Sequence, residues 1–221
     1  MHLVDVLREK GSYFFTRLVE GLPATVEVAI GALLFALIFG LIIALLRLSR
    51  WRVFRYPAIA YIEFLRGTPA LVQLFVIYFG LPDVGIQLAP LHAAIIGLGL
   101  NGAAYLAEIY RAGIEAIHKG QLEAALTLGM TPAKAIAYII LPQAIRTMLP
   151  PITSFAIVLL KDTAIVFAVA VPEIMAYARN LVTETLQSAV VYLMAGAIYL
   201  CMTIPMARFA ARLERAKRAW R

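Results

Sequence analysis

Long apolar stretches alternate with short polar and basic segments along this chain. A helix of about 20 apolar residues crosses the hydrocarbon core of a bilayer. Five stretches reach that length: Leu22–Leu46, Tyr56–Gly80, Leu91–Ala112, Leu149–Val171 and Ser188–Phe209. The pattern therefore predicts an all-α membrane protein with about five spanning helices.

The second stretch is interrupted by polar residues and by a proline. Glu63 and Arg66 carry charges within it, and Pro69 follows closely after Gly67. Proline cannot donate a backbone hydrogen bond, and broken helices at membrane depth occur where the backbone lines a cavity. We therefore expect a broken or kinked helix at this point.

Composition agrees with a membrane protein. Hydrophobic residues make up 62% of the chain and charged residues 15%, with mean hydropathy +0.85. Soluble domains contain about 45–50% apolar and about 25% charged residues. The net charge is +7, but the basic residues gather at the ends of apolar stretches. The lipid bilayer explains that placement, so nucleic acid is not an expected partner.

The distribution of basic residues predicts the orientation, because cytoplasmic loops are enriched in Lys and Arg. Loops one and three and the C-terminal tail are basic, whereas the second loop, residues 81–85, has no Lys or Arg. The basic residues are Arg47, Arg50, Arg52 and Arg55; Arg111, Lys119, Lys134 and Arg146; and Arg208, Arg212, Arg215, Lys217, Arg218 and Arg221. The N-terminus is therefore expected outside and the C-terminus in the cytoplasm.

The chain divides into three predicted regions. Residues 1–20 are expected to form an extracytoplasmic surface helix, 21–213 the membrane domain, and 214–221 a basic cytoplasmic tail. The apolar face of the first helix comprises Leu3, Val6, Leu7, Phe14 and Phe15. Cys201 lies in an apolar stretch without metal-ligand spacing around it, so we expect a small buried hydrophobe.

A polar segment between the third and fourth apolar stretches predicts a helical hairpin. Residues 121–128 are good helix formers, and Gly129 supplies a helix stop. Thr131-Pro132 resembles an N-cap followed by proline at the first helical position, and Leu141-Pro142 is expected to end the second helix. The expectation is two short helices with a tight turn.

The side chains of this hairpin suit contact with another protein. Ala124, Ala125 and Gly129 are small and let another surface approach the backbone, while Glu123 offers one charge. The alternative is an amphipathic hairpin that only packs under the bundle.

The spacing resembles a known family element. E-A-A-x-x-x-G at 123–129, followed by I-x-L-P at 139–142, resembles the EAA loop of ABC-transporter permeases. R-G-T-P-x-x-x-Q at 66–73 and N-x-A-A-Y-x-A-E at 101–108 are similar to segments of bacterial polar amino-acid permeases of the histidine, glutamine and arginine type.

The resemblance implies a type I ABC importer transmembrane domain over 21–213, with a cytoplasmic EAA coupling hairpin. Two permease subunits, identical or homologous, would form the path in the bacterial inner membrane. Two ABC ATPase subunits would dock on the hairpins, and an extracytoplasmic amino-acid-binding protein would deliver the substrate. ATP and Mg would bind to the ATPase, and no cofactor or metal is expected on this chain. The coupling residues it implies are Glu123, Ala124, Ala125, Gly129, Leu141 and Pro142.

Several polar residues are expected at similar depth in the bilayer, near the midpoints of the second, third and fourth stretches. Ionisable residues at this depth are costly and usually functional. Asn101, Tyr105 and Glu108 also share one helical face through their i, i+4, i+7 spacing. The candidates for the substrate path are Arg66, Asn101, Tyr105, Glu108, Lys161, Asp162 and Thr163.

A zwitterionic substrate needs partners for both of its charges. Asp162 or Glu108 would meet the ammonium group, and Arg66 or Lys161 the carboxylate. The alternative is that these charges pair with one another inside the bundle, Arg66 with Asp162 and Glu63 with Lys161 or Arg66.

Two other function classes compete with an importer subunit. A stand-alone secondary transporter or channel explains the intramembrane charges but not the small-residue hairpin. A membrane-embedded enzyme lacks support, because no nucleophile–base pair or metal cluster stands out. No G-x-x-x-x-G-K-[ST] loop occurs in the sequence, so we expect a permease subunit that is not itself an enzyme, although the whole complex would hydrolyse ATP.

Overall fold

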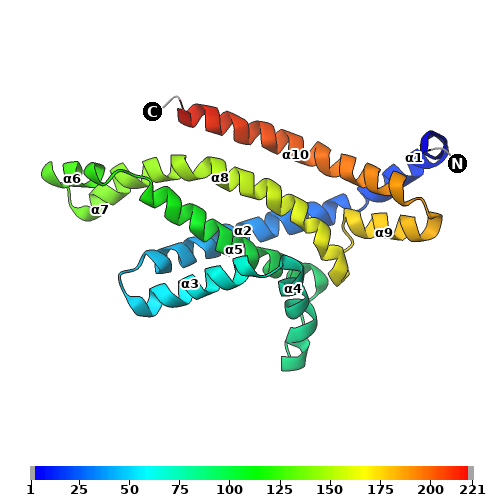
Figure 1. The fold of residues 1–221 in the computed structure, drawn as a ribbon, viewed down its shortest axis with the longest axis horizontal. Helices are drawn as coiled ribbons and strands as arrows, with labels where there is room; N and C mark the ends of the chain where they lie inside the picture. The colour runs from blue at the N-terminus through cyan, green and yellow to red at the C-terminus, as the bar shows by residue number, and fades with distance from the viewer. Residues whose placement is uncertain (1–2, 219–221) are drawn as a thin grey trace.

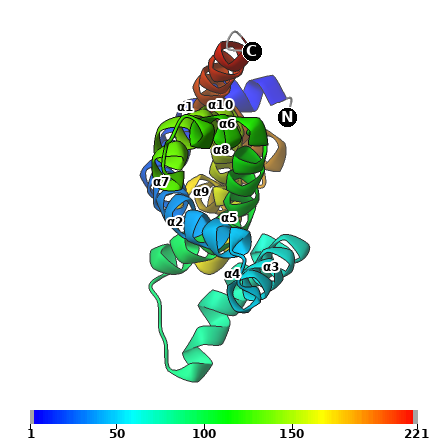
Figure 2. The same cartoon turned by 90° about the vertical axis from the view of Figure 1, so that its left-hand side faces the viewer.

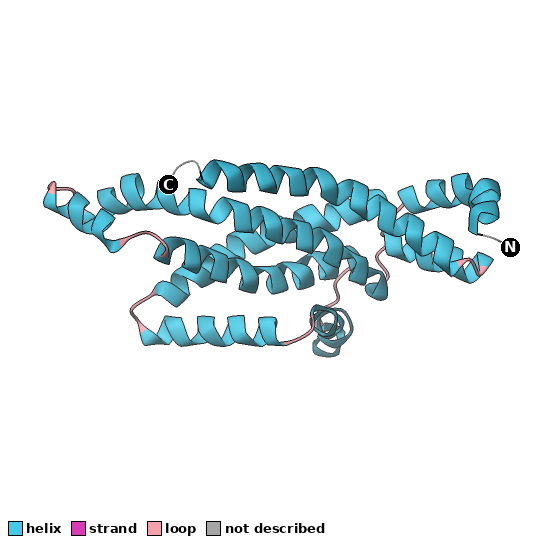
Figure 3. Ribbon diagram, turned by 45° about the horizontal axis from the view of Figure 1, so that its top comes forward, coloured by secondary structure: helices cyan, strands magenta, loops and turns pink. Residues whose placement is uncertain are grey.

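The computed structural model describes residues 3–218, and every regular element among them is a helix (Figure 1, Figure 3). The α-helices are α1 (Leu3–Val19), α2 (Leu22–Leu48), α3 (Arg52–Gly67), α4 (Ala70–Phe75), α5 (Pro90–Glu115), α6 (Lys119–Thr127), α7 (Pro132–Ala135), α8 (Leu141–Asp162), α9 (Ile174–Thr185) and α10 (Ser188–Arg218). Short π-helical or 3₁₀ segments are η1 (Val76–Gly80), η2 (Leu81–Val84), η3 (Ile136–Ile140) and η4 (Thr163–Val169).

The number of helices that are long and apolar enough to cross a membrane agrees with the predicted number of spans. Four stretches qualify, namely Asp5–Leu48, Pro90–Glu115, Pro132–Val169 and Ser188–Arg215. The helix α3 and the helical segment that follows it, residues 70–84, are together long and apolar enough to give a fifth candidate, although they are bent relative to each other. The expected all-α membrane fold is confirmed.

The closest helix pair is α2 with α5, and small residues make this packing possible. Ala32, Ala36, Gly40 and Ala44 recur at every fourth position of α2 and are buried. A Cβ at Gly40 would lie 3.0 Å from the backbone oxygen of Ala103 on α5. Small residues let helix backbones approach in a membrane, where apolar burial gives no driving force between helices. The helices α3, α4 and α8 pack against this pair.

The N-terminal helix packs on protein along one face. Val6, Phe14 and Leu18 are buried against residues of α9 and α10, including Ile174 and Val191. The predicted helix is confirmed over Leu3–Val19, while its placement on the outer membrane surface stays a prediction. Residues 1 and 2 of the predicted region 1–20 lie outside the described residues.

A buried carboxylate joins α9 to α10, and its backbone packs against the start of α2. Glu173 caps α9 by accepting hydrogen bonds from the backbone N–H groups of Met175 and Ala176, each at 2.8 Å. The hydroxyl of Tyr199 on α10 donates a third at 2.8 Å. A Cβ at Gly21 would lie 2.5 Å from the carbonyl carbon of Glu173, so only glycine fits there. Burial raises the pKa of Glu173 to about 6, against the opposing effect of its three hydrogen-bond donors.

One expectation about the helix that leads into the fourth apolar stretch is wrong. Leu141-Pro142 was expected to end a helix, but the chain stays helical from α7 through η3 into α8. The π-helical turn of η3 directly precedes Pro142, which then occupies one of the first positions of α8, where its missing N–H costs least. The continuous helix that contains the fourth apolar stretch therefore begins at Pro132, well before Leu149.

The first and last described helical turns of the chain lie toward opposite ends of the molecule. The α6–α7 hairpin and the described end of α10 lie toward one end, and α1 and α9 lie at the other (Figure 1). Viewed from the hairpin end, α3 and α4 stand to one side of the other helices (Figure 2). The helix α10 continues unbroken through residue 214, and residues 219–221 of the predicted tail lie outside the described part.

We predict a pH-dependent contribution of Glu173 to stability. Because its pKa is higher in the folded than in the unfolded protein, the folded state binds the proton more tightly, and stability rises as pH falls from about 7 toward 4.5. The shift corresponds to about 2 kcal/mol at most. The melting temperature of the purified wild type minus that of Glu173→Gln should fall as pH rises from 5 to 7.5.

The control is Glu184→Gln, on the exposed side of the same helix. The difference in melting temperature between Glu184→Gln and the wild type should stay constant over this pH range. A constant difference for Glu173→Gln as well would contradict the assignment.

Candidate functional site

The polar centre of the molecule is built around the break between α3 and α4. Thr68 and Pro69 adopt extended backbone conformations, and the two helical segments are bent by 106°. The residue before a proline is disfavoured in the helical region, which explains the position of the break. The last carbonyls of α3 thereby lose their helical partners. The predicted broken helix is confirmed.

The side chain of Gln73 fills the place of the missing backbone donors. Its Nε2 group donates to the carbonyl oxygen of Leu65 at 2.8 Å and to the carbonyl and hydroxyl oxygens of Thr68 at 3.0 and 2.8 Å. Gln73 is buried. A carbonyl without a partner at membrane depth costs several kcal/mol, so this one amide stabilises the break.

Asn101 ties the break to α5. Its Nδ2 group donates to the carbonyl oxygen of Leu65 at 3.1 Å and to Oε1 of Gln73 at 3.0 Å. The predicted site residue Asn101 is therefore part of a three-helix network, and Gln73 is its centre. Gln73 was missing from the predicted site, although it belongs to the R-G-T-P-x-x-x-Q segment; an amide four residues after a helix-breaking proline was the available signal.

Arg66 and Tyr105 lie beside this network. The guanidinium carbon of Arg66 is 5.3 Å from the ring centroid of Tyr105, a cation–π arrangement. On α8, Phe155 stacks on the same ring, with centroids 5.9 Å apart. A Cβ at Gly102 would lie 3.1 Å from the ring of Phe155, so glycine makes room for it. Arg66 forms no ion pair with any residue in the described chain.

Glu108 completes the predicted polar face of α5, but its charge is already neutralised. Its carboxylate lies 2.5 Å from Arg47 of α2 and 3.0 Å from Arg111. Arg111 also pairs with Glu115. The network joins the ends of α2 and α5. Among residues 3–218, the alternative pairing of Arg66 with Asp162 is not formed, nor is an ion pair of Glu63.

A cleft of about 410 Å³ opens between α3, α5 and α8. Arg66 and Glu108 line it, together with Arg111, Thr147 and Pro151 among others. Small-molecule sites typically have volumes of about 300–1,000 Å³ and a few convergent polar groups. Two of the predicted path residues thus face one cavity of suitable size.

The three predicted residues at the end of α8 lie apart from this cleft. Lys161 is exposed, Asp162 is partly buried and Thr163 is buried, where its hydroxyl donates to the carbonyl of Leu160 at 2.7 Å. In the described residues no ion pair involves Lys161 or Asp162. The following segment η4 packs against α4 and α5, so they neighbour the polar centre without direct contact to Arg66 or Asn101.

The polar hairpin between α5 and α8 is well defined. Gly129 has φ +82°, the left-handed conformation that glycine tolerates, and Thr131 caps α7 by accepting from the N–H of Lys134 at 3.4 Å. The buried Ala125 and Ala135 close the hairpin on its inner side. The other five predicted coupling residues are exposed, namely Glu123, Ala124, Gly129, Leu141 and Pro142.

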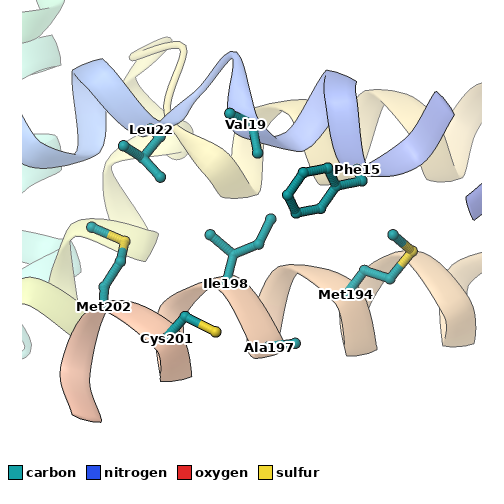
Figure 4. A pocket seen from close by; sticks show the side chains of 8 residues that line it. All are labelled: Phe15, Val19, Leu22, Met194, Ala197, Ile198, Cys201 and Met202. Atoms are coloured by element: carbon teal, nitrogen blue, oxygen red, sulfur yellow. The ribbon is translucent and has the colours of Figure 1, made fainter. Parts of the chain in front are cut away.

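A second cavity has a different character. A groove of about 390 Å³ between α1 and α10 is lined by apolar side chains, among them Phe15, Leu22, Ile198 and Met202 (Figure 4). No charged residue lines it, so it offers nothing to hold a zwitterion. Cys201 also lines this groove and is exposed, so the expectation of a buried thiol is wrong: its side of α10 is not covered within this chain.

Apolar spans, a polar centre at a helix break and an exposed hairpin together define a membrane-embedded permease subunit. Residues 36–219 match the family described as "Binding-protein-dependent transport system inner membrane component". The chain belongs to this family and is the multi-pass inner-membrane permease subunit of an ABC importer, a class that works with ATPase subunits and a binding protein.

Similar proteins agree with this assignment. The chain is 42% identical to "Probable amino-acid permease protein YxeN" of Bacillus subtilis, covering 91% of this chain and 92% of that relative. It is 36% identical to the "Arginine transport system permease protein ArtQ" of the same organism, covering 90% and 91%. A solved structure titled "Crystal structure of an amino acid ABC transporter with histidines" aligns with TM-score 0.87 and 36% identity over 98% of this chain and 99% of that one.

We predict that Gln73→Leu destabilises the protein strongly. The substitution removes the side-chain donor to the carbonyl of Thr68 and one of the two partners of both the Leu65 carbonyl and the Asn101 amide, at about 1–3 kcal/mol for a group left unsatisfied. The melting temperature of the solubilised complex should fall by at least about 5 °C. The control Gln121→Leu, on the exposed surface of the hairpin, should shift it by less than about 2 °C. Equal shifts of the two variants would refute the role of Gln73.

Proposed function

We propose that this chain forms half of the membrane path for a polar amino acid. A binding protein outside the membrane delivers the substrate, and ATP hydrolysis on separate subunits drives its passage. The observation that carries the proposal is the gathering of Arg66, Asn101 and Tyr105 around the α3–α4 break, beside a cleft of suitable size. The printed names of the similar proteins YxeN and ArtQ support an amino acid as the substrate class.

The partners of each side chain suggest different roles in the path. Arg66 has only an aromatic ring beside its guanidinium, so it is the group we assign to the substrate carboxylate. Asp162 is partly buried and has no ion pair in the described chain, and we assign it to the ammonium group at another point of the path, because it does not line the cleft of Arg66. Lys161 precedes it on α8, and Thr163 follows it as the first residue of η4.

Residues whose polar groups already have partners are assigned to the frame of the path. Asn101 donates to the break and to Gln73, Tyr105 lies between Arg66 and Phe155, and Glu108 is held by two arginines. Asn101 and Tyr105 hold α5 against α3, and Glu108 holds α5 against α2, so we do not assign them to the substrate charges. The carboxylate of Glu108 is costly to release from its arginines, because Arg47 would then lose its ion-pair partner.

The hairpin is the proposed docking element for the ATPase. It leaves the end of α5, which carries Asn101 and Tyr105, and enters α8, which carries Asp162. A displacement of the hairpin therefore reaches both helices of the path. The exposed Glu123, with Ala124 and Gly129 beside it, offers a charge and a close approach to the backbone.

The remaining subunits follow from the same proposal. Two copies of this chain, or this chain and a homologue, enclose the path, and one ATPase docks on each hairpin. ATP and Mg bind to the ATPases, while this chain holds neither a cofactor nor a catalytic site. The N-terminus lies outside and the C-terminus in the cytoplasm, since the hairpin and the basic C-terminal half of α10 lie toward the same end.

A stand-alone secondary transporter is the second candidate, supported only by the intramembrane charges. Uptake by proteoliposomes separates the two. An importer requires the ATPase, ATP and the binding protein, whereas a secondary carrier works from an ion gradient with this chain alone. Uptake without the ATPase would overturn the proposal.

We predict that Asp162→Asn lowers ATP-driven uptake at least about ten-fold, because one charge partner of the substrate is lost. Transport is measured in proteoliposomes with the complete complex, and assembly is checked by size-exclusion chromatography. The control Asp83→Asn changes an exposed carboxylate outside the cleft and should transport like the wild type. Unchanged uptake by assembled Asp162→Asn would remove Asp162 from the path.

We predict that Glu123→Ala weakens ATPase docking or uncouples hydrolysis from transport. Glu123 is exposed and has no ion pair among the described residues, so the fold should tolerate the change. The ratio of amino acid transported to ATP hydrolysed, measured in proteoliposomes, should fall several-fold. The control Glu184→Ala lies on α9 at the other end and should keep the wild-type ratio. A wild-type ratio in Glu123→Ala would argue against the docking role.

A further inference from the structure

A basic pocket lies where α2, α3 and α5 meet, at the end of the bundle that carries the first basic loop. The 27 residues of α2 span about 40 Å, more than the hydrocarbon core of about 30 Å. The last turn of α2, with Arg47, therefore reaches the level of the lipid headgroups. The first turn of α3 follows after three residues and lies at the same level.

The pocket has a volume of about 240 Å³ and is lined mainly by cationic groups. Arg47 and Leu48 come from α2, Arg55 and Ile59 from α3, and Arg111 and Glu115 from α5. Three arginines thus meet one carboxylate around a space large enough for a phosphate group.

One of the three arginines of the pocket has no ion pair within the described chain. Arg47 is held by Glu108, and Arg111 by Glu108 and Glu115. Arg55 lines the same pocket and forms no ion pair with a residue that the structure describes. No acidic residue occurs between positions 47 and 62, whereas Arg50 and Arg52 add two further charges nearby. The electrostatics of the pocket therefore favour an anion.

The rim, defined here as the residues next to Arg55 in the sequence, carries exposed apolar side chains. Trp51, Val53, Phe54 and Tyr56 belong to the same segment as Arg55 and expose between 52% and 77% of their surfaces. Aromatic side chains of this kind sit at the membrane–water interface. A site for a soluble anion needs no such rim, whereas a phospholipid places its phosphate in the pocket and its acyl chains along α3.

We propose that this pocket binds the headgroup phosphate of an anionic phospholipid, with Arg55 as the main contact. Basic pockets between transmembrane helices bind such headgroups in other membrane proteins. Arg47 and Arg111 complete the phosphate site but are also required for the ion pairs of α2 and α5. Arg55 is the residue whose substitution tests lipid binding without breaking those pairs. This proposal is independent of the nature of the transported substrate.

The test measures lipid bound to the purified complete complex. The complex is exchanged into nanodiscs containing a few per cent of phosphatidylglycerol in phosphatidylcholine, re-extracted, and its retained lipid is quantified by native mass spectrometry. We expect the wild type to retain phosphatidylglycerol selectively, and Arg55→Gln to retain about five-fold less. Arg55→Lys, which keeps the charge but not the two-pronged hydrogen bonding, should fall between them.

The matched control is Arg212→Gln, an exposed arginine on α10 near the same end of the molecule. It should retain phosphatidylglycerol like the wild type. Equal retention by Arg55→Gln and the wild type would overturn the proposal, and so would equal loss in the two glutamine variants. Displacement of the lipid by millimolar inorganic phosphate would also overturn it, because the site would then recognise a free anion.

Discussion

The polar centre depends on one constraint: the carbonyl groups at the end of α3 have no helical N–H partners and need other donors. Water is absent from the hydrocarbon region, so a helix broken there needs donors from side chains. Gln73 and Asn101 supply them, and both must stay in place for the break to persist. The need to satisfy these carbonyls fixes α4 against α3 and α3 against α5. The path residues Arg66 and Tyr105 take their positions from that arrangement.

The helix α5 is the element shared by most of the structure. Its small residues pack against α2, Asn101 holds the break, Glu108 binds the arginine of α2, and its end leads into the hairpin. Close backbone contact along α2 makes this pair stiff, since interiors packed without voids transmit displacement. A subunit that must carry motion from a docking surface to a path benefits from such a stiff connection.

Sequence reasoning reached the features that depend on local chemistry. Gly67 and Pro69 marked the break, and Gly129 with Thr131 marked the turn of the hairpin, because backbone restrictions act within a few residues. It missed the partners that tertiary packing chooses. Gln73 bonds to groups 5, 8 and 28 residues away, and Glu108 pairs with Arg47 of α2, although equal depth had suggested other pairs. The helix end expected at Pro142 was wrong because a wider turn accommodates the proline.

That wider turn, η3, has a consequence for geometry. A π-helical turn holds one residue more than the α-helical turn it replaces, and one residue corresponds to about 100° of rotation around the axis. The side chains of α7 are therefore rotated about the helix axis, relative to those of α8, from the positions they would have in a regular α-helix. The residues that the hairpin exposes and the residues that α8 buries thus follow different helical registers, although α7, η3 and α8 form one continuous helix.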